Sequence, residues 1–373
     1  MSMPQIHVIL VSAQAAPNLL PALDPAMKPH KVIMLVSQKM RAQADALNLV
    51  FRENAIDTKQ VELANEHDIK YLEETMMNLA TQHPSEHVAL NLTGGTKLMA
   101  LAAQSIAGLA GWATFYVDVD TDEVIWIDGK RNNKKLTEQL RLRHYLLGYG
   151  FRIKGSIERL QPNVKYEQLI STLLLQIGSL ESPLSQLNWL TQQAEDRRSL
   201  SVTMSENQSD SIGLQTLLRN FSDSGLLQIH GLTLQFSNED DRNFVKGGWL
   251  EHHVYRIVEA LTQQLGIRDK AVNLSIIKDG VSKEMDVIYM ARNRPYVIEC
   301  KTARMDKPEA PKANDALFKL TDVSRVLGLG ANKMLASYRK LRDSEKDLAK
   351  ALGIQVVCGE DLNHLKEKIL KWA

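Results

Sequence analysis

Residues 284–302 read EMDVIYMARNRPYVIECKT, two apolar runs joined by a polar turn at 292–295. The two runs predict adjacent strands of a sheet. Side chains alternate between the faces of a strand, so Glu284 and Asp286 share one face, and Glu299 and Lys301 share a face of the next strand. Buried charged groups are costly unless they are paired or bind a metal. The stretch therefore indicates a functional site inside a sheet.

A divalent metal explains these charges. Mg²⁺ or Mn²⁺ prefers oxygen ligands, which Asp286, Glu299 and the backbone carbonyl of Cys300 would supply. Lys301 would lie beside the metal-bound water and stabilise transition-state charge. Glu251, on a preceding predicted helix, is expected to reach the same end of the sheet and to bind a second metal or orient water. The alternative is an ion pair of Lys301 with Asp286 or Glu299 in an inert sheet.

The pattern around this stretch predicts an α/β domain with a mixed sheet. Helices are expected at residues 249–265, 315–327 and 344–352 and at the C-terminus, and further strands at 272–277, 333–336 and 354–358.

The first part of the chain alternates strands with helices. Strands are predicted at residues 6–12, 31–37, 58–63 and 87–93, helices at 39–53, 68–82 and 97–109, and a hairpin at 114–118 and 123–127. Continuous apolar strands separated by helices predict parallel βαβ units, and hence a Rossmann-like sheet. The basic segment 129–135 is predicted to be a loop.

The middle of the chain is mostly helical. Helices are predicted at 164–175, 184–193 and 213–222, followed by a hairpin over 226–236 that turns at His230–Gly231, with loops at 201–211 and 237–242. This order is typical of a winged helix-turn-helix. The candidate recognition segment 215–222 holds one basic residue, Arg219, which favours a spacer over a DNA reader. We expect domains over residues 1–150, 151–242 and 243–373.

A glycine turn joins the fourth predicted strand to its helix. Thr93 is followed by Gly94, Gly95, Thr96 and Lys97. Two glycines let backbone N–H groups approach an anion at a helix N-terminus, and Lys97 adds positive charge. The turn matches neither the Walker A loop nor the dinucleotide fingerprint. A plain tight turn is the alternative.

Composition limits the function classes. The chain has 373 residues, two cysteines and a formal net charge of +1. Two cysteines cannot make a disulfide framework, and a near-neutral charge argues against a general nucleic-acid coat. The chain has no signal-peptide pattern and no run of about 18 apolar residues. We therefore expect a cytoplasmic protein without membrane spans.

Two motifs carry a family resemblance. Asp286 with Glu299-Cys300-Lys301, between helices, resembles the PD-(D/E)xK nuclease motif. NLTGGTKLMA after a fourth Rossmann strand resembles the signature of CRISPR-associated Rossmann-fold (CARF) domains. The order of the three parts is similar to that of single-chain CARF nucleases of type III CRISPR systems. That resemblance implies a homodimer that binds a cyclic oligoadenylate, typically cyclic tetra-adenylate, and then cleaves DNA or RNA with a metal in antiviral defence.

The resemblance also implies residue roles. The catalytic positions would be Glu251, Asp286, Glu299 and Lys301, with Glu284 and the helical Lys319 as secondary candidates. The cyclic ligand would contact Ser12, Ser37, Thr93, Gly94, Gly95, Thr96 and Lys97. Two other functions stay open: a ligand-responsive winged-helix transcription regulator with an inactive nuclease domain, and a restriction or repair endonuclease that needs no activator.

Overall fold

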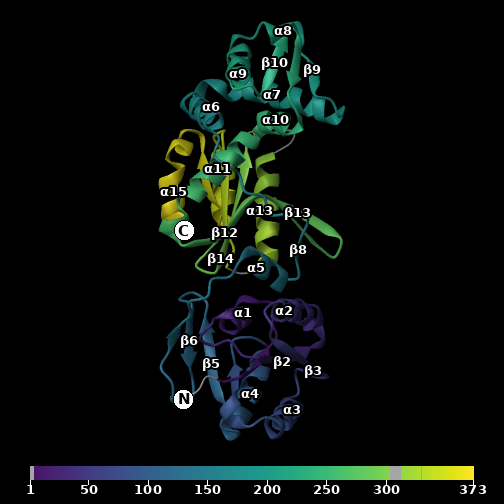
Figure 1. Cartoon of the computed structure of the whole chain (residues 1–373), viewed down its shortest axis with the longest axis vertical. Helices are drawn as coiled ribbons and strands as arrows, with labels where there is room; N and C mark the ends of the chain where they lie inside the picture. The colour runs from purple at the N-terminus through teal and green to yellow at the C-terminus, as the bar shows by residue number, and fades with distance from the viewer. Residues whose placement is uncertain (1–3, 303–311, 329) are drawn as a thin grey trace.

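The computed structural model describes residues 4–302, 312–328 and 330–373. The chain is elongated, with the N-terminal sheet at one end, the C-terminal sheet in the middle and a mostly helical module at the other end (Figure 1). Among the described residues, no helix combines the length and apolar character needed to cross a membrane.

The N-terminal sheet has the order β3-β2-β1-β4-β5-β6-β7. Strands β1 to β5 are parallel neighbours, whereas β6 and β7 are antiparallel additions. The strands are β1 (Ile6–Leu10), β2 (Lys31–Ser37), β3 (Asp57–Leu63), β4 (Val88–Asn91), β5 (Ala113–Asp118), β6 (Glu123–Trp126) and β7 (Lys134–Lys135). The predicted strands and hairpin are confirmed. The expected loop at 129–135 is wrong in part, because β7 pairs with β6 there.

Helices cover both faces of this sheet, as continuous apolar strands require. Helices α3 (Ile69–Gln82) and α4 (Lys97–Leu109) pack on one face. Helices α1 (Ala16–Leu23) and α2 (Arg41–Glu53) pack on the other. Helix α1 was not predicted, since it is short and holds Pro17 and Pro21. Proline is tolerated in the first turn but rarely deeper in a helix.

A short connector ties the N-terminal sheet to the C-terminal one. Helix α5 (Leu142–Gly148) is followed by β8 (Arg152–Ile153), which pairs with a strand of the C-terminal sheet. The Tyr145 hydroxyl donates to the carbonyl of Leu327 at 2.6 Å. One apolar core continues from α1 and α2 through α5 into the C-terminal part. A conformational change in the N-terminal sheet can therefore be transmitted to the C-terminal sheet through contacts between packed side chains.

The helical module contains the predicted helices and hairpin. It is built from α6 (Val164–Leu175), α7 (Ile177–Asp196), α8 (Glu206–Ser209), α9 (Ile212–Asp223) and a sheet of order β10-β11-β9, with β9 at Ser201–Thr203, β10 at Leu227–His230 and β11 at Thr233–Phe236. His230 pairs with Thr233, so the turn is at residues 231–232 and not at His230–Gly231. The winged-helix assignment itself stays a prediction.

Both expected loops in this part of the chain are wrong in part. Segment 201–211 includes β9, which joins the hairpin, and the capped helix α8. Segment 237–242 includes the first turn of α10 (Glu239–Asn243). The Asn238 side chain caps this helix by accepting a hydrogen bond from the Asp241 N–H. Ser and Asn occur in loops but also cap helices, so composition alone gave the wrong state here.

The C-terminal sheet has the order β16-β15-β14-β13-β12-β8. Its strands are β12 (Ile267–Lys278), β13 (Val281–Ala291), β14 (Arg294–Lys301), β15 (Asn332–Ser337) and β16 (Gln355–Cys358). Strands β12 to β14 form an antiparallel meander, and β14 to β16 are parallel. The β13–β14 turn is shorter than expected: Arg292 and Asn293 both have positive φ, as a two-residue hairpin turn requires.

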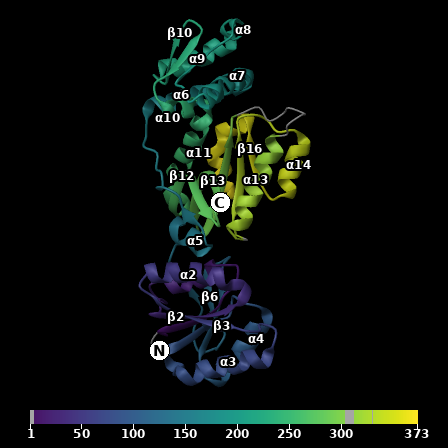
Figure 2. The same cartoon turned by 90° about the vertical axis from the view of Figure 1, so that its right-hand side faces the viewer.

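Helices on both faces complete a three-layer domain. Helices α11 (Trp249–Ala260) and α15 (Leu365–Trp372) pack with the core of the helical module. Helices α13 (Lys312–Val326) and α14 (Asp343–Ala351) belong to the core shared with the N-terminal part. Figure 2 shows α11 and α13 on opposite sides of the strands. The predicted helix 249–265 is interrupted at Leu261, after which α12 (Thr262–Leu265) begins.

Candidate functional site

The predicted carboxylates lie on adjacent strands. Val287 of β13 pairs with Ile298 of β14 in the antiparallel ladder. Asp286 precedes Val287 and Glu299 follows Ile298, so the two acids lie opposite each other. Both are buried, with Glu299 2% exposed. The Cys300 backbone N–H donates to Asp286 Oδ2 at 2.7 Å, which fixes that carboxylate against β14. The strands thus hold two acids at one point of the sheet.

Two lysines neutralise these acids. Lys301 Nζ lies 2.6 Å from Glu299 Oε1 and 3.6 Å from Asp286 Oδ2. Lys319 Nζ, from α13, lies 2.8 Å from the same Glu299 oxygen and 3.7 Å from Asp286 Oδ1. From the sequence Lys319 is only a secondary candidate, but the structure places it in direct contact with both carboxylates. Burial alone would lower the pKa of Lys301, but the carboxylates of Asp286 and Glu299 raise it above its ordinary value.

Glu251 reaches this site from α11. Burial raises its pKa to about 7, and the negative charge of Asp286 adds to the shift. A carboxyl group with this pKa exchanges a proton near neutral pH, as a general base does. Cys300 points its thiol into the core on the α11 side, where burial raises the thiol pKa. Only its backbone carbonyl is therefore suited to bind a hard cation.

The donor set fits Mg²⁺ or Mn²⁺, which bind carboxylate and carbonyl oxygen. The Lys301 and Lys319 ammonium groups already contact the oxygens of Asp286 and Glu299 that a cation would use. In this arrangement the described residues bring no three His, Cys, Asp or Glu side chains into metal-binding geometry. A metal would thus be held by two carboxylates and the Cys300 carbonyl, with water completing the shell.

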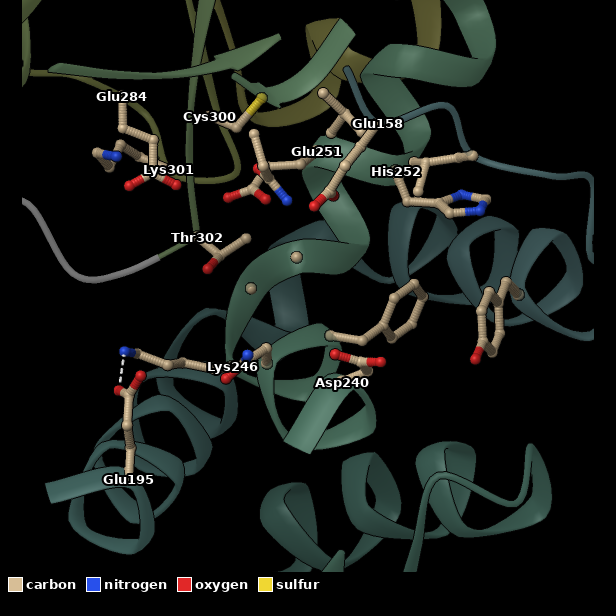
Figure 3. A pocket seen from close by; sticks show the side chains of 18 residues that line it. Glu158, Glu195, Asp240, Lys246, Glu251, His252, Glu284, Cys300, Lys301 and Thr302 are labelled. Carbon is tan, nitrogen blue, oxygen red and sulfur yellow. Dashed lines mark hydrogen bonds and ion pairs between the residues drawn. The ribbon is translucent and has the colours of Figure 1, made fainter. Parts of the chain in front are cut away.

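A cleft of about 870 Å³ opens onto this site between the C-terminal sheet and the helical module. Glu251, Lys301 and the secondary candidate Glu284 line it on the sheet side (Figure 3). Lys246, on the opposite wall, makes an ion pair with Glu195 of α7. Glu251, Glu284 and Lys301 therefore border a space that is open to a substrate, and the buried Asp286 and Glu299 lie behind this lining, in contact with Lys301.

The glycine turn lies at the carboxyl edge of the N-terminal sheet. A Cβ at Gly94 would stand 2.0 Å from the carbonyl oxygen of Leu10, and Gly95 has φ +72°. Only glycine fits the first position, and the second is strained for other residues. The turn brings the end of β4 against the end of β1, where a Gly94 Cβ would also lie 3.4 Å from Ser12 Oγ.

The two threonines of the turn have structural hydrogen bonds. Thr93 Oγ1 donates to Asn91 Oδ1 at 2.7 Å and accepts from the Val117 N–H at 2.7 Å. Asn91 Nδ2 in turn donates to the Pro17 carbonyl and to Asn18 Oδ1. Thr96 caps α4 by accepting from the Met99 N–H. The hydrogen bond between Asn91 and Asn18 was not predicted, because a single asparagine at the end of a strand resembles any turn residue.

The other predicted ligand residues lie at the same edge. Ser12 follows β1 and is half-buried, and its hydroxyl donates to the Gln14 carbonyl at 3.4 Å. Ser37 is buried and ends β2, the strand next to β1. Lys97 is exposed and begins α4. Ser12, Ser37 and the turn thus follow three adjacent strands, as a ligand site at the carboxyl edge of a parallel sheet requires.

Family models match both sheet domains. The model described as Card1 CARF domain matches residues 6–145, and the model described as Card1-like, endonuclease domain, matches residues 238–373. The chain joins a CARF domain to a Card1-like endonuclease domain. The glycine turn lies in the first match and the carboxylate–lysine cluster in the second. No curated protein matches the chain in sequence.

Solved structures share the fold over nearly the whole chain. Protein VC1899 from Vibrio cholerae has a TM-score of 0.88 at 25% identity, covering 98% of this chain and 97% of its own. Can2 from Sulfobacillus thermosulfidooxidans, solved with cyclic tetra-adenylate, has a TM-score of 0.81 at 24% identity, covering 99% and 97%. A type III CRISPR defence DNA nuclease activated by cyclic oligoadenylate has a TM-score of 0.57 at 19% identity, and covers 91% of this chain but 46% of its own.

Proposed function

We propose that this protein is a metal-dependent nuclease of CRISPR defence that a cyclic oligoadenylate switches on. The observation that carries the nuclease part is the pair of buried carboxylates, Asp286 and Glu299, with Lys301 within 3.6 Å of both. The similarity to Can2, solved with cyclic tetra-adenylate, supports the activator. The glycine turn offers such a ligand backbone N–H groups and the Lys97 ammonium.

The residues divide the hydrolysis of a phosphodiester among them. Asp286, Glu299 and the Cys300 carbonyl would hold Mg²⁺ or Mn²⁺, and such a metal would polarise the phosphate and lower the pKa of water. Lys301 stabilises the charge that develops on the phosphate oxygens. Glu251, with its pKa near 7, takes the proton of the attacking water.

The activator would act through a homodimer. Helix α4, which begins at the glycine turn, exposes Leu98, Leu101 and Leu109, the last of them 76% exposed. Exposed apolar rows of this kind mark protein interfaces. A ligand bound across two such turns can activate a distant site only if it binds the active arrangement better than the resting one. One apolar core continues from α1 and α2 into α13, so a rearrangement at the CARF turn can be transmitted to the nuclease domain through packed side chains.

The test is cleavage by the purified full-length protein with Mn²⁺, with and without cyclic tetra-adenylate. Single- and double-stranded DNA and RNA are offered as substrates. We expect cleavage only with both metal and activator. Cleavage without activator would support a restriction or repair enzyme. Sequence-specific DNA binding without any cleavage would support the transcription regulator.

A further inference from the structure

The cleft beside the carboxylates has an aromatic wall that hydrolysis does not use. Tyr166 of α6 and Phe244, the first residue of the π-helix η3 (Phe244–Gly248), both line the cleft and are half-buried. Their rings stack, with centroids 4.4 Å apart and an interplanar angle of 30°. The His252 ring meets both edge-on, at 5.6 and 5.9 Å. Three rings thus meet at one end of the cleft.

The aromatic wall adjoins the proposed general base, Glu251. His252 directly follows Glu251 on α11, and both line the cleft. Figure 3 shows Glu251 and His252 projecting from the same helix into this space. The His252 ring is in contact range of Phe244. A phosphate held beside Glu251 and Lys301 would therefore have the ring cluster as a neighbour in the same cleft.

The charged side chains that line the cleft are mostly acidic. Lysines line the cleft at two described positions: Lys301, which pairs with Glu299, and Lys246, which pairs with Glu195. Acids line it at five described positions: Glu158, Glu195, Asp240, Glu251 and Glu284. Away from a bound metal, this lining repels phosphate but accepts hydrogen bonds from N–H groups. Asp240, on α10, lies four residues before Phe244, about one helical turn.

A nucleobase has the properties that this end of the cleft requires. It is flat and uncharged, it stacks on aromatic rings, and its amino groups donate to carboxylates. We propose that Tyr166 and Phe244 form a nucleobase subsite, in which the unpaired base next to the scissile phosphate stacks on the ring pair. Asp240 accepts a hydrogen bond from the amino edge of that base. This inference rests on the proposed nuclease function and adds the part of the substrate that the helical module holds.

The test measures binding, so it does not depend on cleavage. The probe is a short single-stranded DNA with one 2-aminopurine, whose fluorescence falls when the base stacks; its position is scanned along the strand. Full-length Asp286→Asn protein with cyclic tetra-adenylate and Mn²⁺ holds the probe without consuming it. In this background we compare Phe244→Leu, Phe244→Trp and, as matched control, Phe318→Leu, a 54% exposed phenylalanine of α13 outside the cleft lining.

We expect quenching at one position of the strand and about tenfold weaker binding in Phe244→Leu, since stacking of one base contributes on this order. Phe244→Trp keeps the ring and should bind like the parent, as should Phe318→Leu. Equal affinity of Phe244→Leu and the parent would overturn the subsite. Equal loss in Phe244→Trp and Phe244→Leu would also overturn it, because the ring would then only pack the module.

The outcomes separate the subsite from the proposed function. Cleavage by the wild-type protein with a KM that Phe244→Leu leaves unchanged overturns the subsite alone. Phe244-dependent quenching in a protein that cleaves nothing overturns the nuclease and supports the subsite. Absence of binding under all conditions overturns both.

Discussion

The two candidate sites of this chain differ in the groups that form them: charged side chains in one and backbone in the other. The nuclease site consists of charged side chains buried in a sheet, where Asp286, Glu299, Lys301 and Lys319 neutralise one another. The CARF site consists of a backbone turn, where Gly94 and Gly95 bring two strands together. The threonine hydroxyls beside them support the fold.

This difference decides what each site shows before a ligand binds. Buried charges need a reason, so the nuclease residues indicate chemistry by their types alone. The glycines of the turn, in contrast, are explained by the fold alone, because the Leu10 carbonyl leaves no room for a Cβ at Gly94. Substitutions of charged side chains should therefore abolish the function of the nuclease site. The CARF site should be sensitive to substitutions of its glycines, which set the backbone, and of the exposed Lys97.

The largest effect is expected at Asp286. Asp286→Asn keeps the shape of the side chain but removes the charge that a metal needs, so cleavage should fall on the order of 10³-fold or more. Asp322→Asn is the matched control, because Asp322 of α13 is half exposed and pairs with Lys283. Initial cleavage rates with Mn²⁺ and activator measure both. Residual activity within tenfold of wild type in Asp286→Asn would remove this residue from the site.

The next effect distinguishes the lysine of the CARF turn from its glycines. Lys97→Ala should weaken activator binding about tenfold, as the loss of one charge-assisted phosphate contact does, and leave the melting temperature unchanged. Gly94→Ala should lose binding and also lower the melting temperature, since its Cβ would clash with the backbone of Leu10. Lys28→Ala, at an exposed position before β2, is the control. Calorimetric titration with cyclic tetra-adenylate measures the binding; equal affinity in Lys97→Ala would contradict the assignment.

A smaller effect is expected at Lys319. Its ammonium contacts Glu299 Oε1, an oxygen that a metal would use. Lys319→Met should therefore lower the Mn²⁺ concentration for half-maximal binding severalfold. Lys368→Met, which breaks the exposed pair with Asp361, should change nothing. The measurement is Mn²⁺ titration followed by electron paramagnetic resonance. Weaker Mn²⁺ binding in Lys319→Met would show that the lysine organises the metal site instead of competing for it.

The smallest effect at neutral pH concerns His7 of β1. It is fully buried against Phe115, and burial lowers its pKa from 6.5 to about 3. Between pH 6.5 and 3, His7 is protonated in the unfolded chain but neutral in the folded chain. The contribution of neutral His7 to the free energy of unfolding is therefore complete above pH 6.5 and falls by about 1.4 kcal/mol per pH unit between pH 6.5 and 3. His7→Leu should flatten the unfolding free energy measured between pH 7 and 5; an unchanged slope would assign the acid sensitivity to other groups.

The strands and the order of the two sheet domains could be predicted from the sequence. So could the four charged residues that the structure brings together, whose catalytic roles stay a prediction. Apolar runs set the strands, and charges inside them stand out because burial is costly. Sequence reasoning could not place Lys319 against Glu299. That contact depends on how α13 docks on the sheet, 20 residues along the chain, and no local pattern encodes helix docking.

Prediction was weakest where one residue type serves several structures. The Ser/Asn-rich segment 201–211 was expected to be a loop, yet it holds β9 and α8. Thr93 and Thr96 were assigned to a ligand, and their hydroxyls already have partners within the fold. Neither ambiguity can be resolved without the positions of the neighbouring strands.

Coupling between the two sites is the central claim, and one titration tests it directly. Cleavage of a labelled strand is followed while cyclic tetra-adenylate is added to wild-type and Lys97→Ala protein at fixed Mn²⁺. We predict no cleavage without the ligand, a saturable rise with it, and the same maximum rate at about tenfold higher ligand concentration in Lys97→Ala. Cleavage that is independent of the ligand in both proteins would contradict the coupling.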